Sequence, residues 1–90
     1  MLLVSYDISN NKTRSNFSKF LSKFGHRLQY SLFEINNSKR ILNLIQIEIK
    51  TEYAKRFEET DSIMIFQMSS NCVITKYGYA KHQDQDLVLF

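Results

Sequence analysis

Hydrophobic and polar residues alternate along the first eight positions of the chain. The even-numbered positions are apolar or aromatic, whereas the odd-numbered positions become polar and end on Ser5 and Asp7. Because successive side chains of a strand point to opposite faces of a sheet, the pattern predicts a strand over residues 1–8. It also predicts that Asp7 points away from the face that carries the helices.

A helix is predicted for residues 12–24, where apolar side chains recur at helical spacing and lysines and serines fill the other side. The apolar positions are Phe17, Phe20, Leu21 and Phe24. The candidate N-caps are Ser9, Asn10 and Asn11. Gly25 is expected to end this helix in the left-handed conformation.

The middle of the chain is predicted to contain a strand and a second helix. Residues 27–35 are rich in aromatic and branched side chains, which are typical of strands. After a turn at 36–37, Ser38 is the expected N-cap of a helix that continues to about Phe57. The segment 45–49 alternates like a strand, but we expect packing against the rest of the protein to make it helical.

Strands are predicted for the last part of the chain, at 62–68, 72–78 and 86–90. The succession indicates the α+β class and a ferredoxin-like βαββαβ sandwich, with both helices on one face of an antiparallel sheet and an additional C-terminal strand. The other face is then too apolar to lie in water, and the last strand has no local partner. We therefore expect a homodimer that covers this face, with the terminal strand a candidate for crossing to the partner subunit.

Length and composition limit the possible classes of protein. Ninety residues suffice for one domain, 1–90, and the apolar fraction of 43% is ordinary for a globular protein. No apolar run approaches the roughly 20 residues that span a bilayer, and the start does not resemble a signal peptide. The single cysteine, Cys72, cannot form an internal disulfide, which fits a reducing compartment. The sequence therefore predicts a cytoplasmic protein with no membrane partner.

Positive charge is concentrated in the first part of the chain, although the net charge is only +3. No acidic residue lies between Asp7 and Glu34, and the cations of this stretch are Lys12, Arg14, Lys19, Lys23 and Arg27. Lys39 and Arg40, at the start of the second predicted helix, extend the set. Scattered lysines usually mark a solvated helix face, but the absence of acids favours contact with phosphates. Such binding would be salt-sensitive and largely independent of base sequence.

Asp7 has two interpretations that the residues alone leave open. A lone aspartate after a strand most often caps a helix or holds a turn, but nearer capping residues downstream partly free it from that role. Alternatively, two copies of Asp7 approach one another in a two-fold dimer, where a divalent cation or a shared proton would relieve their repulsion. An oxygen-rich site of this kind would suit Mg²⁺ or Mn²⁺.

Other chemistries lack their sequence signatures. A nucleophilic Ser31 would need a nearby base, and neither His26 nor His82 lies in a matching motif. The chain has no phosphate-binding glycine loop and no dinucleotide fingerprint. The RNA-recognition module shares the predicted topology, but the strand SIMIFQM at 62–68 lacks the glycines and paired aromatic residues of that module.

The order of these segments resembles a known family. An apolar strand ending in YDIS, a basic helix, and then FGHRLQYSLFEI, DSIMIF and YGYAK are similar to the Cas2 family of CRISPR adaptation proteins. The similarity covers nearly the whole chain. Its most specific part is VSYD followed at this distance by G-x-x-x-Q-x-S-x-F-E.

This resemblance implies a ferredoxin-like homodimer with one divalent metal ion, Mg²⁺ or Mn²⁺, at the dimer interface and Asp7 as its ligand. It matches the family's helix arginine with Arg14. It also matches a serine and a phenylalanine near the proposed active centre with Ser31 and Phe33. The implied partners are the Cas1 integrase, whose dimers the family bridges, and the duplex DNA of a new spacer. For some members the resemblance also implies metal-dependent cleavage of RNA or duplex DNA.

The chain departs from many relatives in the loop after YD, where Asn10 and Asn11 replace acidic residues. A metal ion would then depend on Asp7 from each subunit, backbone oxygens and water. Two functions remain: a structural adaptor in spacer integration, and an endonuclease in which Asp7 positions magnesium for phosphodiester hydrolysis. The alternative is a nucleic-acid-binding module of the same fold with no catalytic activity and no role in CRISPR.

Overall fold

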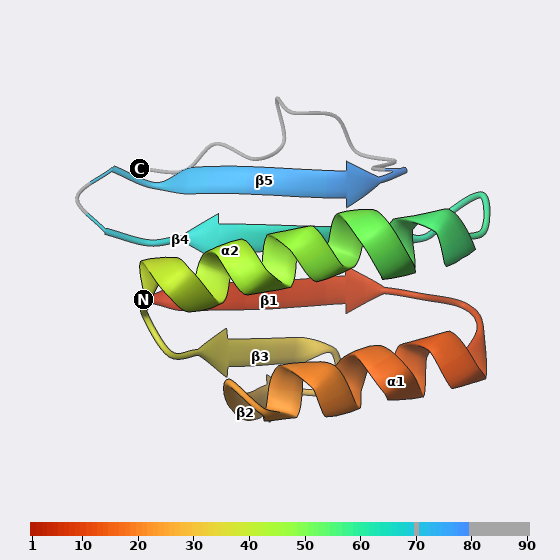
Figure 1. Cartoon of the computed structure of the whole chain (residues 1–90), viewed down its shortest axis with the longest axis horizontal. Coiled ribbons are helices and arrows are strands. Elements are labelled where there is room, and N and C mark those ends of the chain that lie inside the picture. Colours follow the sequence, from red (N-terminus) through yellow and green to blue (C-terminus); the bar gives the residue numbers. More distant parts are fainter. Residues whose placement is uncertain (70, 80–90) are drawn as a thin grey trace.

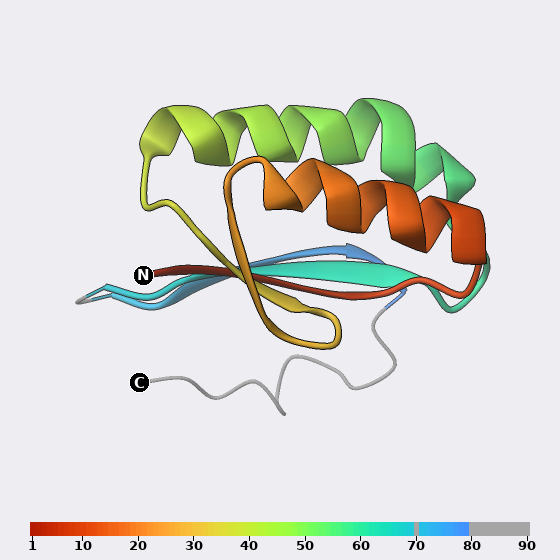
Figure 2. The same ribbon diagram turned by 90° about the horizontal axis from the view of Figure 1, so that it is seen from below.

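The computed structural model describes residues 1–69 and 71–79, and it places two helices on one face of a five-stranded antiparallel sheet (Figures 1 and 2). The elements in chain order are β1 (Leu2–Asp7), α1 (Asn11–Ser22), β2 (Gly25–Gln29), β3 (Leu32–Ile35), α2 (Lys39–Glu48), β4 (Ser62–Gln67) and β5 (Val73–Gly78). A π turn, η1 (Ile49–Tyr53), and a 3₁₀ turn, η2 (Ala54–Arg56), extend α2. In these residues no helix has the length and apolar character needed to cross a bilayer.

The sheet order β2-β3-β1-β4-β5 is compatible with the predicted ferredoxin-like plan, but the strands differ from the prediction in one place. Residues 27–35 form a hairpin rather than one strand, because the chain reverses at Tyr30 and Ser31. The Tyr6 amide donates a hydrogen bond to the Ser31 carbonyl oxygen over 3.1 Å, which holds the turn against β1. The hairpin supplies the two strands that a βαββαβ plan needs between its helices. β5 follows as an additional strand, and the predicted strand at 86–90 lies outside the described residues.

The core lies between the sheet and the two helices. Strand alternation places every second residue of β1 in it, as predicted, and the α1 and α2 faces close it from above. The Phe17 ring lies 5.3 Å from the Tyr6 ring and 4.8 Å from the Tyr53 ring, so α1 joins β1 to the extension of α2. The predicted helical state of 45–49 is confirmed, because Ile45 and Ile49 are buried in this core.

Side-chain caps set the starts of both helices. Asn10 accepts a hydrogen bond from the Thr13 amide over 2.9 Å and caps α1, and Ser38 accepts one from the Ile41 amide over 3.3 Å and caps α2. Both were among the predicted caps. The prediction for Gly25 was wrong, because Gly78 (φ 83°) is the described glycine in the left-handed region. Gly25 instead begins β2, where a Cβ atom would overlap the Glu34 carbonyl group of β3.

Replacing Gly25 by alanine should therefore lower the free energy of unfolding by about 2 to 3 kcal/mol, because the overlapping neighbour is backbone and cannot rotate away. Urea denaturation followed by circular dichroism measures the change. His26→Ala, an exposed position on the same strand, is the control and should stay within about 0.5 kcal/mol of the wild type. Equal stabilities for the two variants would contradict the close-approach explanation.

Candidate functional site

Asp7 is the last residue of β1, and its side chain is exposed on the face of the sheet opposite the helices. We call this surface the Asp7 face. Alternation places Leu3 and Ser5 on it from β1, and the register places Phe66, Met64 and Ser62 of β4 beside Leu3, Ser5 and Asp7 respectively. The predicted orientation of Asp7 is thus confirmed.

The surroundings of Asp7 decide against a capping role. Asn10 caps α1, and the Asp7 carboxylate makes no hydrogen bond or ion pair with any residue of 1–69 or 71–79. Within these same residues, no group of three or more His, Cys, Asp or Glu side chains is placed to hold a metal ion. A single carboxylate with hard oxygen donors fits Mg²⁺ or Mn²⁺ in chemistry, but the residues of one subunit that the structure describes do not complete a ligand set.

Asp61, which the sequence did not single out, holds the loop after Asp7 in place. Its side chain is 1% exposed, and its Oδ1 atom accepts hydrogen bonds from the Ser9 amide (3.0 Å) and hydroxyl (2.8 Å). Its Oδ2 atom accepts one from the Glu58 amide (2.9 Å). Burial alone would raise the pKa of Asp61. The hydrogen bonds from Glu58 and Ser9 outweigh burial and hold that pKa below its ordinary value.

The loop that Asp61 fixes also carries the contacts of Arg14. One guanidinium nitrogen of Arg14 donates to the carbonyl oxygens of Ile8 (2.9 Å) and Ser9 (3.4 Å). The other donates to the side-chain oxygen of Asn11. A continuous set of hydrogen bonds therefore runs from Asp61 through Ser9 to Arg14. Asp7 and Arg14 are positioned by the same short loop, although Asp7 belongs to the opposite face of the sheet.

Three of the predicted site residues come together in a cavity of about 190 Å³ between α1 and the β2–β3 turn. We call it the arginine pocket, and its lining residues are Tyr6, Asn11, Arg14, Ser15, Ser18, Arg27, Tyr30 and Ser31. None of the described residues that line it is acidic. Arg27 donates a hydrogen bond to the Ser18 hydroxyl, and its guanidinium carbon lies 5.3 Å from the centre of the Phe33 ring.

The remaining predicted cations are exposed and lie elsewhere on the helix layer. Lys12, Lys19 and Lys23 are seven and four residues apart, so they share one side of α1. We call them the lysine row. Lys39 and Arg40 begin α2, which starts at the end of the sheet opposite Asp7 (Figure 1). The structure thus divides the predicted basic patch into three parts.

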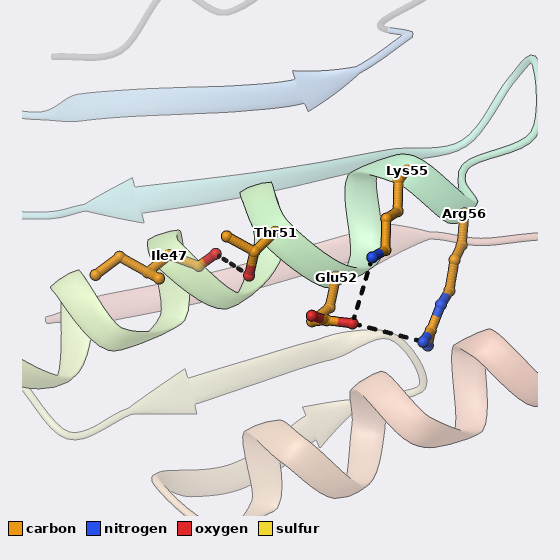
Figure 3. Close-up of polar contacts among 5 residues, drawn as sticks. All are labelled: Ile47, Thr51, Glu52, Lys55 and Arg56. Atoms are coloured by element: carbon orange, nitrogen blue, oxygen red, sulfur yellow. Dashed lines mark hydrogen bonds and ion pairs between the residues drawn. The ribbon is translucent and has the colours of Figure 1, made fainter.

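None of these cations forms an ion pair with a carboxylate among residues 1–69 and 71–79. The extension of α2 is different. Figure 3 shows Glu52 between Lys55 (3.9 Å) and Arg56 (3.6 Å), so one carboxylate offsets both cations there. Among the described residues, cations without a carboxylate partner therefore lie on α1, at Arg27, at the start of α2 and at Lys50 of the extension.

The structure places Ser31 differently from the prediction, whereas Phe33 lies on a strand as expected. Ser31 lies in the hairpin turn rather than in the middle of a strand, and it reaches the arginine pocket. Phe33 is 1% exposed and packs below Arg27 and beside Tyr6, so its contribution is to the core beneath the pocket. Tyr30 was not among the predicted site residues, and its position at the pocket depends on the turn.

Fold and site together define the class: a small α+β protein with two helices on one face of an antiparallel sheet, a carboxylate at a strand end on the other face, and a basic helix layer. The family model of CRISPR associated protein Cas2 matches residues 1–75. The chain therefore belongs to the Cas2 family, and its role is CRISPR-associated.

Individual relatives agree with this assignment. A protein named CRISPR-associated endoribonuclease Cas2 from Mycobacterium tuberculosis is 36% identical over 78 residues, which are 86% of this chain and 65% of that protein. The chain thus spans slightly less than two thirds of that relative. CRISPR-associated endoribonuclease Cas2 2 of Methanospirillum hungatei is 28% identical over 90 residues, covering 98% of this chain and 97% of the relative. CRISPR-associated endoribonuclease Cas2 3 of Synechocystis is 30% identical over 71 residues, covering 79% of this chain and 74% of the relative. No solved structure matches the chain at a significant level.

Proposed function

We propose that this protein is a dimeric adaptor in CRISPR adaptation, which bridges dimers of the Cas1 integrase and holds duplex DNA while a new spacer is acquired. Membership of the Cas2 family supports the CRISPR role. The observation that carries the DNA-holding part is the positive charge of the helix layer that no described carboxylate offsets. Lysines without carboxylate partners bind phosphates in a salt-dependent way that ignores base sequence, which suits a protein that must accept any spacer.

The Asp7 face supports the homodimer. Leu3, Phe66 and Ile74 are neighbours across three strands of this face, and all are only partly buried within one subunit. A second copy placed on this face would remove the apolar side chains from water. The same two-fold arrangement brings the two copies of Asp7 towards one another when the axis passes near the ends of the β1 strands.

Reversing the charge of the lysine row tests the adaptor. The triple variant Lys12→Glu, Lys19→Glu, Lys23→Glu should weaken binding of a blunt DNA duplex at low salt. The slope of log K against log salt should fall by about 0.9 for each phosphate that the variant no longer neutralises. Fluorescence anisotropy over a series of salt concentrations measures both quantities.

Lys55→Glu is the control, because Lys55 is an exposed cation on the extension of α2 whose charge Glu52 already offsets. It should leave the salt slope unchanged. If the triple variant bound duplex DNA with the affinity and slope of the wild type, the lysine row would have no part in holding DNA.

A second candidate function is endonuclease activity on RNA or DNA, and it rests on Asp7. The relatives carry the word endoribonuclease in their names. In this chain Asp7 is an exposed carboxylate without a bonding partner among the described residues. Asp7 from each subunit would hold the ion, and a bound magnesium ion would supply polarisation of the phosphodiester and a more acidic water. The chain's own contribution is to position Asp7 through the rigid end of β1 and the loop that Asp61 fixes.

A further inference from the structure

We propose that the arginine pocket binds one unpaired nucleotide, with the phosphate on Arg14 and Arg27 and the base stacked on Tyr30. The inference rests on the proposed nucleic-acid binding and adds to it a site for a single-stranded end. The pocket lies on the helix side of the hairpin, whereas Asp7 lies on the opposite face of the sheet. Binding in the pocket therefore does not depend on a metal ion at Asp7.

The charge of the pocket identifies the first part of the ligand. The acceptors that Arg14 and Arg27 contact among residues 1–69 and 71–79 are all neutral: carbonyl oxygens, an amide oxygen and a hydroxyl. Neither guanidinium forms an ion pair with a described carboxylate. Each guanidinium also has five N–H donors, of which these contacts use only some. Two positive charges that share one acid-free cavity repel one another, and an anion between them relieves the repulsion.

Both arginines are already held in place, which favours a bound phosphate. Arg14 is fixed by the backbone of the β1–α1 loop. Arg27 is fixed between the Ser18 hydroxyl and the face of Phe33. Side chains that are ordered before binding lose little conformational entropy when the ligand arrives. The planar fork of a guanidinium matches the oxygen atoms of a phosphate group.

The size of the pocket and the position of Tyr30 identify the rest of the ligand. A volume of about 190 Å³ is below the roughly 300 Å³ at which pockets begin to enclose whole drug-sized ligands. The pocket therefore suits a phosphate with part of its sugar, and the base must lie outside. Tyr30 lines the rim and is 88% exposed, so its ring offers a free surface for stacking. A paired base inside a duplex has both faces occupied, so the nucleotide that fits is unpaired.

The test compares a blunt DNA duplex with the same duplex carrying a short single-stranded overhang, made once with deoxyribonucleotides and once with ribonucleotides. Tyr30→Ala should weaken overhang binding by about 5- to 100-fold and leave blunt-duplex binding unchanged. Tyr30→Phe keeps the aromatic ring and should retain full overhang affinity. Leu28→Ala is the matched control, because Leu28 is exposed on β2 but does not line the pocket. The two overhangs show whether the bound nucleotide is DNA or RNA.

The outcomes separate this inference from the proposed function. Loss of overhang affinity in Tyr30→Ala alone supports the nucleotide site. Equal effects of Tyr30→Ala on blunt and overhang duplexes, or no effect on either, would overturn it while the adaptor proposal stands. A wild-type protein that binds the overhang duplex but not the blunt one would support the pocket and contradict duplex holding. A wild-type protein that binds neither overturns both.

Discussion

The Asp7→Asn variant should lose metal-dependent cleavage of RNA by more than about 100-fold if the protein is an endonuclease. Removing a residue that only contacts a metal ligand already lowers metal affinity or activity 10- to 100-fold. This change removes the one charged ligand that the described residues of each subunit offer at the site. Asparagine keeps the shape of the side chain but not its negative charge. The rate of cleavage of a labelled RNA with magnesium, and the affinity for Mn²⁺ by calorimetry, should fall together.

The fold of this variant should be intact, because the Asp7 side chain is exposed and makes no bond with the described residues. We expect a change in the free energy of unfolding within about 0.5 kcal/mol. Glu34→Gln, which removes a carboxylate from the same face, is the control and should keep cleavage. Cleavage that persists in Asp7→Asn would show that Asp7 is not catalytic.

The same variant separates the adaptor from the enzyme. An adaptor needs its shape and its basic surface, so spacer integration with Cas1 should continue in Asp7→Asn. Loss of integration while the dimer and the complex with Cas1 still assemble would contradict a purely structural role. Sedimentation measures the dimer. If the two Asp7 carboxylates repel one another in the absence of a metal ion, the wild type should associate more weakly than Asp7→Asn without metal.

The orientation of Asp7 could be predicted from the sequence because it depends on a single local rule. Alternation over residues 1–8 determines which side chains face the helices, and β1 obeys it. The caps Asn10 and Ser38 were predictable for the same reason, since each acts within three residues of itself. Local patterns also favoured a helix over most of 38–57, where buried residues recur every fourth position.

The hairpin at 27–35 could not be predicted from such rules. Its turn residues are Tyr30, which is not typical of turns, and Ser31, which marks a reversal only weakly. What holds the turn is a hydrogen bond from Tyr6, a residue of another strand. The arginine pocket depends on this turn, so Arg27, Tyr30 and Ser31 gave no sign in the sequence that they would lie together. The division of the basic patch likewise follows from tertiary placement rather than from charge spacing.

Asp61 is the clearest case of a site residue that only the structure reveals, because its partner Ser9 lies 52 residues away in the chain. It joins the loop before β4 to the loop after β1, and through Ser9 it supports the position of Arg14. Its buried charge is stable only because the surrounding donors satisfy it. Removing that charge should therefore lower the free energy of unfolding more than any other single change proposed for these loops.

The Asp61→Asn variant should be less stable than the wild type by about 2 to 4 kcal/mol at neutral pH. Its amide oxygen can still accept from Ser9, but its NH₂ group would face the Glu58 amide, donor against donor. Urea denaturation measures the difference. Glu59→Gln, an exposed carboxylate in the same loop, is the control and should change stability by less than about 0.5 kcal/mol.

The pH dependence of this difference gives a second check. The pKa of Asp61 is lowered in the folded state, so its ionised form stabilises the fold above the unfolded pKa of about 3.9. That contribution is lost as the pH falls through the lower folded pKa, because the folded protein must then take up the proton. The advantage of the wild type over Asp61→Asn should therefore be constant near neutral pH and shrink below about pH 4. A difference that did not change with pH would mean that Asp61 acts through its shape and not through its charge.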